Sequence, residues 1–261
     1  MDIFSRAGKF RWTSLLLGLS LPLLLVHDVK AASPESAPND LRNSIASIDN
    51  AANGHRLEDL LKFYSPNFST TDGLDERALK KSLFQLWKQY PDLHYQTRLL
   101  SWEQSKEGLV AVTETNIQGT SPQKGTTFTL KSTIKSRQLL RQNQIVKQEI
   151  LAESTQIQSG VKPPQVQIDL PKSVKVTQQY DFDVIIKEPL SNQVAVGYAI
   201  EDKVDPAKYL KPSTLDLEVL QAGGIFKRGK APNTPEDRWL SAILIQSDGM
   251  TIVTQRLKVE R

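Results

Sequence analysis

The chain has 261 residues, of which 39% are hydrophobic and 24% are charged, and this composition is typical of a globular protein rather than a disordered one. It contains no cysteine, which excludes disulfides, thiolate metal sites and a lipid anchor on cysteine. The formal net charge of +4 falls to +2 when residues 1–31 are set aside, because they hold four basic and two acidic residues, and a chain so near neutrality does not favour nucleic acid as a partner.

Residues 1–31 have the layout of a secretory signal peptide. A basic start precedes an apolar run at 15–26, and small or apolar residues at −3 and −1 precede Ala32. The run has twelve residues, fewer than the roughly 20 that a membrane-spanning helix needs. We expect an exported protein of the periplasm or thylakoid lumen, with an uncleaved N-terminal membrane anchor as the alternative.

After a short tail at 32–38, which we expect to be disordered, apolar residues recur at helical spacing. They predict a helix from Asn39 to Gly54, a second that Pro66 ends, and a third that Pro91 stops. Asp72 is expected to cap the third helix, with Asp75 three residues later in a pattern like a capping box.

The pattern then changes to strands. Four β-like runs are expected at about 93–103, 109–119, 126–140 and 144–155, joined by short polar breaks. A linker is predicted at 157–164, where Gly and Pro interrupt the last run, and about seven short strands follow at 165–261. The predicted fold is therefore an α+β domain at 39–156, followed by an all-β domain that is sandwich-like.

The first domain resembles the nuclear transport factor 2-like superfamily, also called SnoaL-like. The resemblance is carried by the segments DNAANGHRLEDLLKFYSPNF, TTDG and DERALKKSLFQLWKQYPD and by the long strands after them. It implies a cone in which three helices pack on a curved antiparallel sheet around an internal cavity. The superfamily includes enzymes, carriers and dimerisation modules, so the resemblance leaves the function open. The region after the linker has only a general likeness to immunoglobulin-like sandwiches.

An enzyme of the cone type needs an ionisable group inside its cavity. The candidate bases are Glu114, Asp72 and His94. Each also has an ordinary structural interpretation, since Asp72 is expected to cap a helix, His94 opens a strand and Glu114 can lie on the exterior of the sheet.

Aromatic residues offer a second hypothesis, a cavity that holds a small apolar ligand such as a pigment or lipid. The candidate lining residues are Tyr64, Trp87, Tyr90, Tyr95 and Trp102. Aromatic residues at helical spacing are also typical of an ordinary core.

Basic residues offer a third hypothesis, docking to a protein partner with an acidic surface or to an anionic membrane. Lys131, Lys135, Arg137 and Arg141 are all odd-numbered, so a strand places them on one face. A long loop is predicted at 223–239, and it offers Lys227, Arg228 and Lys230 as a second candidate surface. An exposed basic face of a sheet is the ordinary alternative.

The sequence therefore predicts an exported, non-enzymatic protein that binds a partner or dimerises through a sheet face, with an accessory or assembly role at the cell envelope or thylakoid. The alternatives are an isomerase, dehydratase or hydrolase acting in the cone, and a carrier of an apolar ligand. We expect no cofactor and no metal, because the two histidines outside residues 1–31 are scattered and no metal-binding motif is present.

Overall fold

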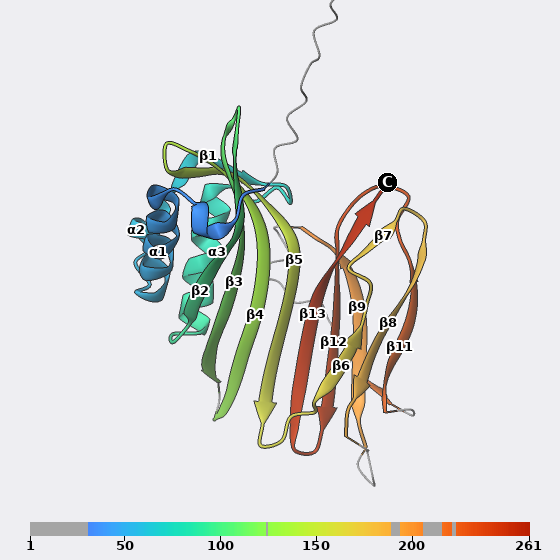
Figure 1. The fold of residues 1–261 in the computed structure, drawn as a ribbon. Helices are drawn as coiled ribbons and strands as arrows, with labels where there is room; N and C mark the ends of the chain where they lie inside the picture. Colours follow the sequence, from blue (N-terminus) through green and yellow to red (C-terminus); the bar gives the residue numbers. More distant parts are fainter. Residues whose placement is uncertain (1–30, 124, 189–193, 206–215, 221–222) are drawn as a thin grey trace, which may run out of the picture. The chain divides into compact units, whose positions relative to one another are not determined.

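The computed structural model describes residues 31–123, 125–188, 194–205, 216–220 and 223–261 (Figure 1). Residues 1–30, which hold nearly all of the predicted signal peptide, lie outside this range. None of the helices in the described part of the chain has the length and apolar character that crossing a membrane requires.

The helices lie near the start of the described chain. A 3-10 helix, η1, and three α-helices are present: η1 Pro34–Ser36, α1 Asn39–Asn53, α2 Leu57–Leu61 and α3 Glu76–Gln89. The third helix begins after Asp75, whose side chain accepts a hydrogen bond from the Ala78 amide at 2.7 Å. Asp75 is thus the N-cap, and the prediction that Asp72 caps this helix is wrong.

Strands make up most of the fold. Their bounds are β1 Tyr64–Thr70, β2 His94–Ser105, β3 Gly108–Gln123, β4 Thr126–Arg141, β5 Gln144–Gly160, β6 Val166–Asp169, β7 Ser173–Lys175, β8 Gln179–Ile186, β9 Val196–Lys203, β10 Glu218–Val219, β11 Gly224–Lys230, β12 Arg238–Gln246 and β13 Gly249–Glu260. The β4–β5 hairpin turns at Gln142 and Asn143, both with positive φ, as a tight two-residue turn of the mirror-image type requires.

The strands form two sheets. A ten-stranded sheet has the order β10-β9-β12-β13-β5-β4-β3-β2, with β1 paired to β5 and β7 paired to β13. A three-stranded sheet has the order β11-β8-β6. The large sheet is continuous across the segment predicted to be a linker, because β5 runs to Gly160 and pairs with β13 from Ser154 to Gly160.

The two faces of the large sheet are covered by different elements. Ile157 packs into the core under the helices, whereas its neighbour Gln156 pairs with Val253, which lies in the core under the three-stranded sheet. Because successive strand residues point to opposite faces, the helices and the small sheet lie on opposite sides. We call these sides the helix face and the outer face. Among the described elements, none covers the outer face of β2–β5.

The edge strand β2 is protected by residues that precede it in the chain. Asn53 of α1 donates to the Tyr95 carbonyl at 3.0 Å and accepts from the Tyr95 amide at 2.6 Å. Farther along, Ala32 forms a bridge with Trp102, and Ala37 is buried. The stretch 32–38, expected to be a disordered tail, therefore includes η1 and packs against the sheet.

The fold class predicted from the sequence, a three-helix α+β cone, is wrong. Of the residues that the structure describes, 58% are in strands and 17% in helices, and they form mainly one large antiparallel sheet with three short α-helices. Helical periodicity correctly predicted α1 and α3, but the second helix ends at Leu61, and Pro66 lies in β1. Periodicity also could not show that the sheet continues past β5 and that the helices cover only part of it. The expectation of a mostly β architecture for the second half is confirmed.

Candidate functional site

The predicted aromatic residues lie on the helix face as packed core. Trp87, Tyr90 and Tyr95 are buried, and the Trp87 indole donates to the Tyr95 hydroxyl at 2.9 Å. The ring of His55 stacks on Trp87 with centroids 4.8 Å apart. Trp102 lies apart from this group, and its indole N–H contacts the Ser33 carbonyl at 3.2 Å and the Ser36 hydroxyl at 3.1 Å.

A small cavity remains between the helices and the sheet. Its volume is about 130 Å³, and its lining includes Tyr64, Tyr95 and Asp49. Pockets that hold drug-sized ligands have volumes of roughly 300–1,000 Å³, so this cavity suits a few water molecules better than a pigment or lipid.

Asp49 is an ionisable group that sequence reasoning missed. Its carboxylate accepts two hydrogen bonds of 2.6 Å from Thr97, one from the amide and one from the hydroxyl. Asp49 and Asn53 are one helical turn apart on α1, so both can satisfy the polar backbone edge of β2. This contact accounts for Asp49 without any catalytic role.

Tyr64, which is partly buried, and Tyr95, which is buried, are poor acid–base groups at neutral pH. Burial raises the pKa of Tyr64 to about 12, with smaller contributions from Tyr95 and Asp49. Burial also raises the pKa of Tyr95 to about 12, although the hydrogen bond from Trp87 acts in the opposite direction. Both phenols therefore stay protonated at physiological pH.

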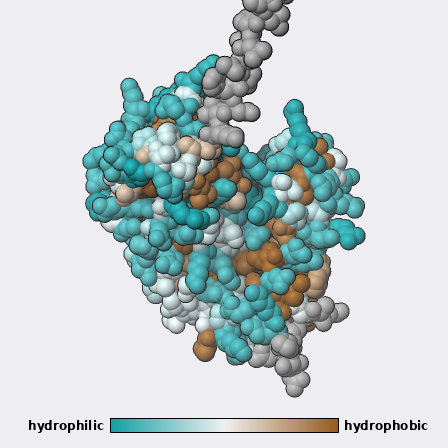
Figure 2. Space-filling view, viewed as in Figure 1, coloured by the Kyte–Doolittle hydropathy of each residue, from teal (hydrophilic) through white to brown (hydrophobic). Residues whose placement is uncertain are grey.

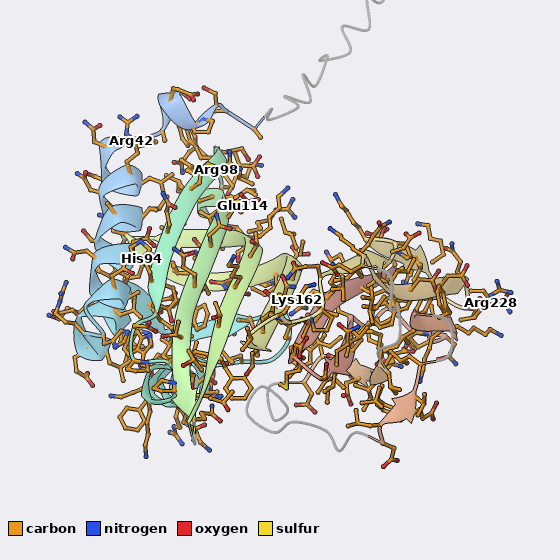
Figure 3. The ribbon with its side chains drawn as sticks, turned by 90° about the horizontal axis from the view of Figure 1, so that it is seen from below. Arg42, His94, Arg98, Glu114, Lys162 and Arg228 are labelled. Carbon is orange, nitrogen blue, oxygen red and sulfur yellow. The ribbon has the colours of Figure 1, made fainter. Side chains whose placement is uncertain are left out.

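The three candidate bases do not meet. Glu114 lies on the outer face, where Arg98 donates to it at 2.9 Å, and His94 is exposed on the same face (Figure 3). Asp72 lies on the helix face in an ion cluster described next. None of the three is among the residues that line the interior cavity.

That ion cluster is built around Arg256, whose side chain is only 1% exposed. The guanidinium contacts three carboxylates: Asp72 at 2.8 Å, Asp237 at 3.0 Å and Glu153 at 3.3 Å. Burial acts to lower the pKa of Arg256, but the hydrogen bond to Asp72 and the negative charge of Glu153 raise it above its ordinary value. The cluster fills the place where β5 changes its partner from β1 to β13.

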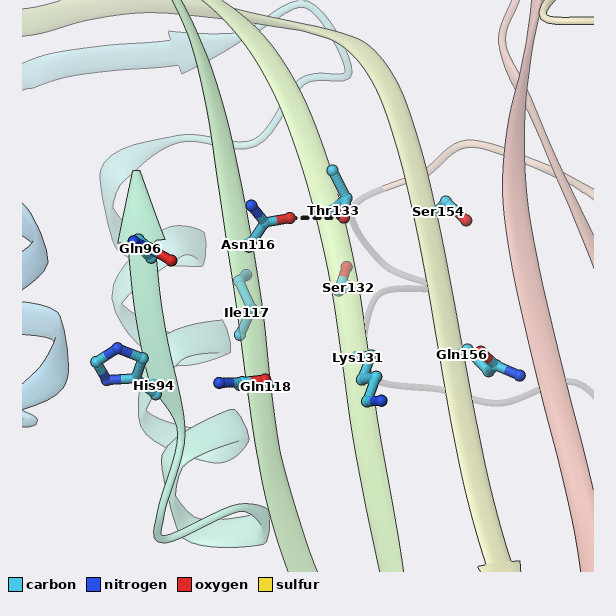
Figure 4. Close-up of a pocket in the computed structure, with 10 residues that line it drawn as sticks. All are labelled: His94, Gln96, Asn116, Ile117, Gln118, Lys131, Ser132, Thr133, Ser154 and Gln156. Carbon is cyan, nitrogen blue, oxygen red and sulfur yellow. Dashed lines mark hydrogen bonds between the residues drawn. The ribbon is translucent and has the colours of Figure 1, made fainter. Parts of the chain in front are cut away.

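The outer face of β2–β5 carries a polar hollow of about 400 Å³ (Figure 4). It is lined by His94, Gln96, Asn116, Ile117, Gln118, Lys131, Ser132, Thr133, Ser154 and Gln156. The strand register places two rows of these side chains across the sheet, one running from His94 to Gln156 and the other from Gln96 to Ser154. Amides and hydroxyls dominate the hollow, and Lys131 adds a positive charge.

The predicted basic stripe lies on this same face. Lys131 and Arg137 are exposed and Lys135 is half-buried. Arg137 is 3.4 Å from Glu149, and Arg141 is 3.5 Å from Glu107. Part of the stripe is thus neutralised. Lys131 lies between two uncharged cross-strand neighbours, Gln118 and Gln156. Lys135 lies between Ala152 and Glu114, and the Glu114 carboxylate also contacts Arg98.

The second basic group lies on a strand, β11, at the start of the segment predicted to be a long loop. Lys227 donates to the Ala199 carbonyl at 2.8 Å and lies 4.8 Å from the centre of the Tyr198 ring. Arg228 pairs with Asp181 at 2.9 Å, and Lys230 is exposed. Lys227 therefore connects the two sheets.

Within the described residues, no group of three or more His, Asp or Glu side chains is placed to hold a metal ion.

Residues 161–260 match the family model described as "Domain of unknown function (DUF8623)". No nuclear transport factor 2-like or SnoaL-like family model matches the chain, so the resemblance inferred from the sequence is contradicted. No curated protein matches the chain.

Two solved structures show weak likenesses. A structure of Bdellovibrio bacteriovorus Bd1075 aligns with 17% identity and a TM-score of 0.31, over 42% of this chain and 38% of that one. The crystal structure of the IdmH 96-104 loop truncation variant aligns with 17% identity and a TM-score of 0.33, over 42% of this chain and 89% of that one. Both TM-scores are too low to establish a shared fold.

Proposed function

We propose that this is an exported, non-enzymatic binding protein with an accessory or assembly role at the cell envelope or thylakoid. Its partner is a protein with an acidic surface, and the outer face of β2–β5 is the surface that binds it. Export is supported by the basic start, the apolar run at 15–26 and the small residues before Ala32.

The observation that carries the proposal is the character of this face. The outer face of β2–β5 combines a polar hollow with the basic stripe, and the described elements leave it uncovered. Amides and hydroxyls can hydrogen-bond with a partner, and positive charge steers an acidic partner towards the surface. The interior cavity between the helices and the sheet, by contrast, has a volume of about 130 Å³.

The enzyme alternative has less support. It needs a base beside a cavity that can hold a substrate. Glu114 is paired with Arg98, and Asp72 is paired with Arg256. Asp49 does line the cavity, but both of its oxygens accept hydrogen bonds from Thr97.

Native mass spectrometry of the protein purified from its own source tests the proposal. We expect a protein complex of fixed stoichiometry, which is lost when Lys131, Lys135 and Arg137 are all replaced by Glu. A matched control reverses Arg77, Lys81 and Lys88, three exposed basic residues of α3 on the opposite side of the sheet. A chain that carries a bound small molecule and no protein, or that associates only with anionic vesicles, would overturn the proposal.

A further inference from the structure

The strand β6 is an edge with an open side. It pairs with β8, and within the described part of the chain no strand pairs with its other side. The Lys187 amide donates to the Gln165 carbonyl at 2.8 Å, so residues 165, 167 and 169 make the bonds to β8. The backbone groups of Val166 and Ile168 therefore point to the open side.

That open side lies towards β5. The small sheet is stacked on the large one in matching order, since Lys227 of β11 contacts Ala199 of β9, and the residues that flank β6 contact β13. Thr251 donates to the Pro164 carbonyl at 2.7 Å, and the Lys258 amide donates to the Lys172 carbonyl at 3.2 Å. Since β5 follows β13 in the large sheet, a strand added beside β6 would lie over the outer face of β5.

The surface under such a strand is polar and basic. Its floor is formed by outer-face side chains of β4 and β5, namely Lys131, Thr133, Lys135, Ser154, Gln156 and Gln158. Beside this floor, Val166, Ile168 and Leu170 pack at the margin of the core between the two sheets, and Figure 2 shows hydrophobic side chains over β13 and β6. Val161, just before β6, is 98% exposed.

We propose that the surface beside β6, over the outer face of β5, binds an extended acidic segment of a protein partner. The segment adds to β6 as a fourth strand of the small sheet, so that its backbone pairs with Val166 and Ile168. Its carboxylates point towards the floor, where Lys131 and Lys135 lie. Because side chains alternate along a strand, its apolar residues point to the opposite face of the small sheet. This inference rests on the proposed function, because it specifies how the same surface recognises its partner.

The probe is a labelled, end-blocked peptide of alternating valine and glutamate, titrated against the full chain by fluorescence anisotropy. We expect saturable binding that weakens with salt, and no comparable binding of the valine–lysine peptide or of a peptide with N-methylated backbone amides. Replacing Lys131 and Lys135 with Glu should abolish binding, whereas the same reversal at Lys81 and Lys88 should leave it unchanged.

The variant Val166→Pro tests the backbone contact. It removes the outward N–H and leaves the bonds of residues 165, 167 and 169 to β8 in place. We expect affinity for the peptide to fall about tenfold, as the loss of one hydrogen bond of about 1.4 kcal/mol implies. Circular dichroism of the variant is the check that it is folded.

The outcomes separate the two proposals. Strand addition is wrong and the binding face stands under one combination of results. In it, reversal of Lys131 and Lys135 abolishes binding of the native partner, Val166→Pro does not weaken that binding, and N-methylation does not weaken binding of the peptide. If neither change affects the native partner, both are wrong. Equal binding of the lysine peptide would overturn the preference for an acidic segment.

Discussion

Arg256 is the residue whose position the sequence explains least. It lies in a strand where Arg256, Lys258 and Glu260 alternate with Leu257 and Val259, and that pattern is typical of a solvated face. It is buried at the place where the pairing partner of β5 changes from β1 to β13. Carboxylates from distant parts of the chain converge there. Such long-range convergence has no local signal in the sequence.

We predict that Arg256→Met destabilises the fold by about 3–5 kcal/mol, because three carboxylates lose the buried guanidinium that contacts all of them. Urea unfolding measures the change. The same substitution at exposed Arg228 is the control and should have little effect, since surface ion pairs contribute little. Equal effects of the two substitutions would contradict a stabilising role for the cluster.

The raised pKa values of Tyr64 and Tyr95 predict how the stability of the fold depends on alkaline pH. Burial raises the pKa of Tyr64 and of Tyr95 to about 12 in the folded chain, against about 10 when unfolded. A raised pKa contributes stability that is complete below pH 10 and is lost as the pH rises from about 10 to 12.

Ultraviolet titration of tyrosinate, followed together with circular dichroism, checks this prediction. We expect a late-ionising group of tyrosines whose titration coincides with unfolding, and Tyr95→Phe should make that group smaller. Ionisation of all tyrosines near pH 10, with the fold intact, would show that the phenols are not buried.

Among the elements, the strands of the first half were the most predictable. The runs expected at 93–103, 109–119, 126–140 and 144–155 match β2 to β5 within a few residues, because alternation and short polar turns are local signals. Helix α1 was equally clear from its apolar stripe. The β1 strand was missed, because Pro66 was interpreted only as the end of a helix.

The hydrogen bonds between α1 and the edge strand β2 are expected to stabilise the fold. Asn53→Ala removes both hydrogen bonds to the backbone of Tyr95, and we expect a loss of about 1–3 kcal/mol, since partly buried polar groups are left without partners. Denaturant midpoints measure the change. Asn43→Ala, at an exposed position of the same helix, controls for helix propensity and should not destabilise the fold.

For the whole molecule, the sequence could not show how its parts are joined. Gly160 and the prolines at 163 and 164 predicted a linker, yet β5 continues to Gly160 and pairs with β13. Proline acts locally, whereas strand pairing is decided by segments about 90 residues apart. The result is one large sheet. The helices cover one of its faces near β2, and the three-stranded sheet covers the other face over β9 and β13.

The candidate surfaces follow from this arrangement. The parity of the basic residues on β4 correctly predicted that they share one face, because alternation is a local property of strands. The open side of β6 and its place over β5 depend on how the two sheets stack, so they could be found only in the structure.

Hydrogen–deuterium exchange on the full chain, alone and in complex with the partner purified from its own source, tests the central claim most directly. We predict that the partner protects amides of β4, β5 and β6, and that the residues around the interior cavity exchange unchanged. Protection confined to α1, α3 and the helix face would contradict the claim, because it would place the ligand inside the molecule rather than on the outer face.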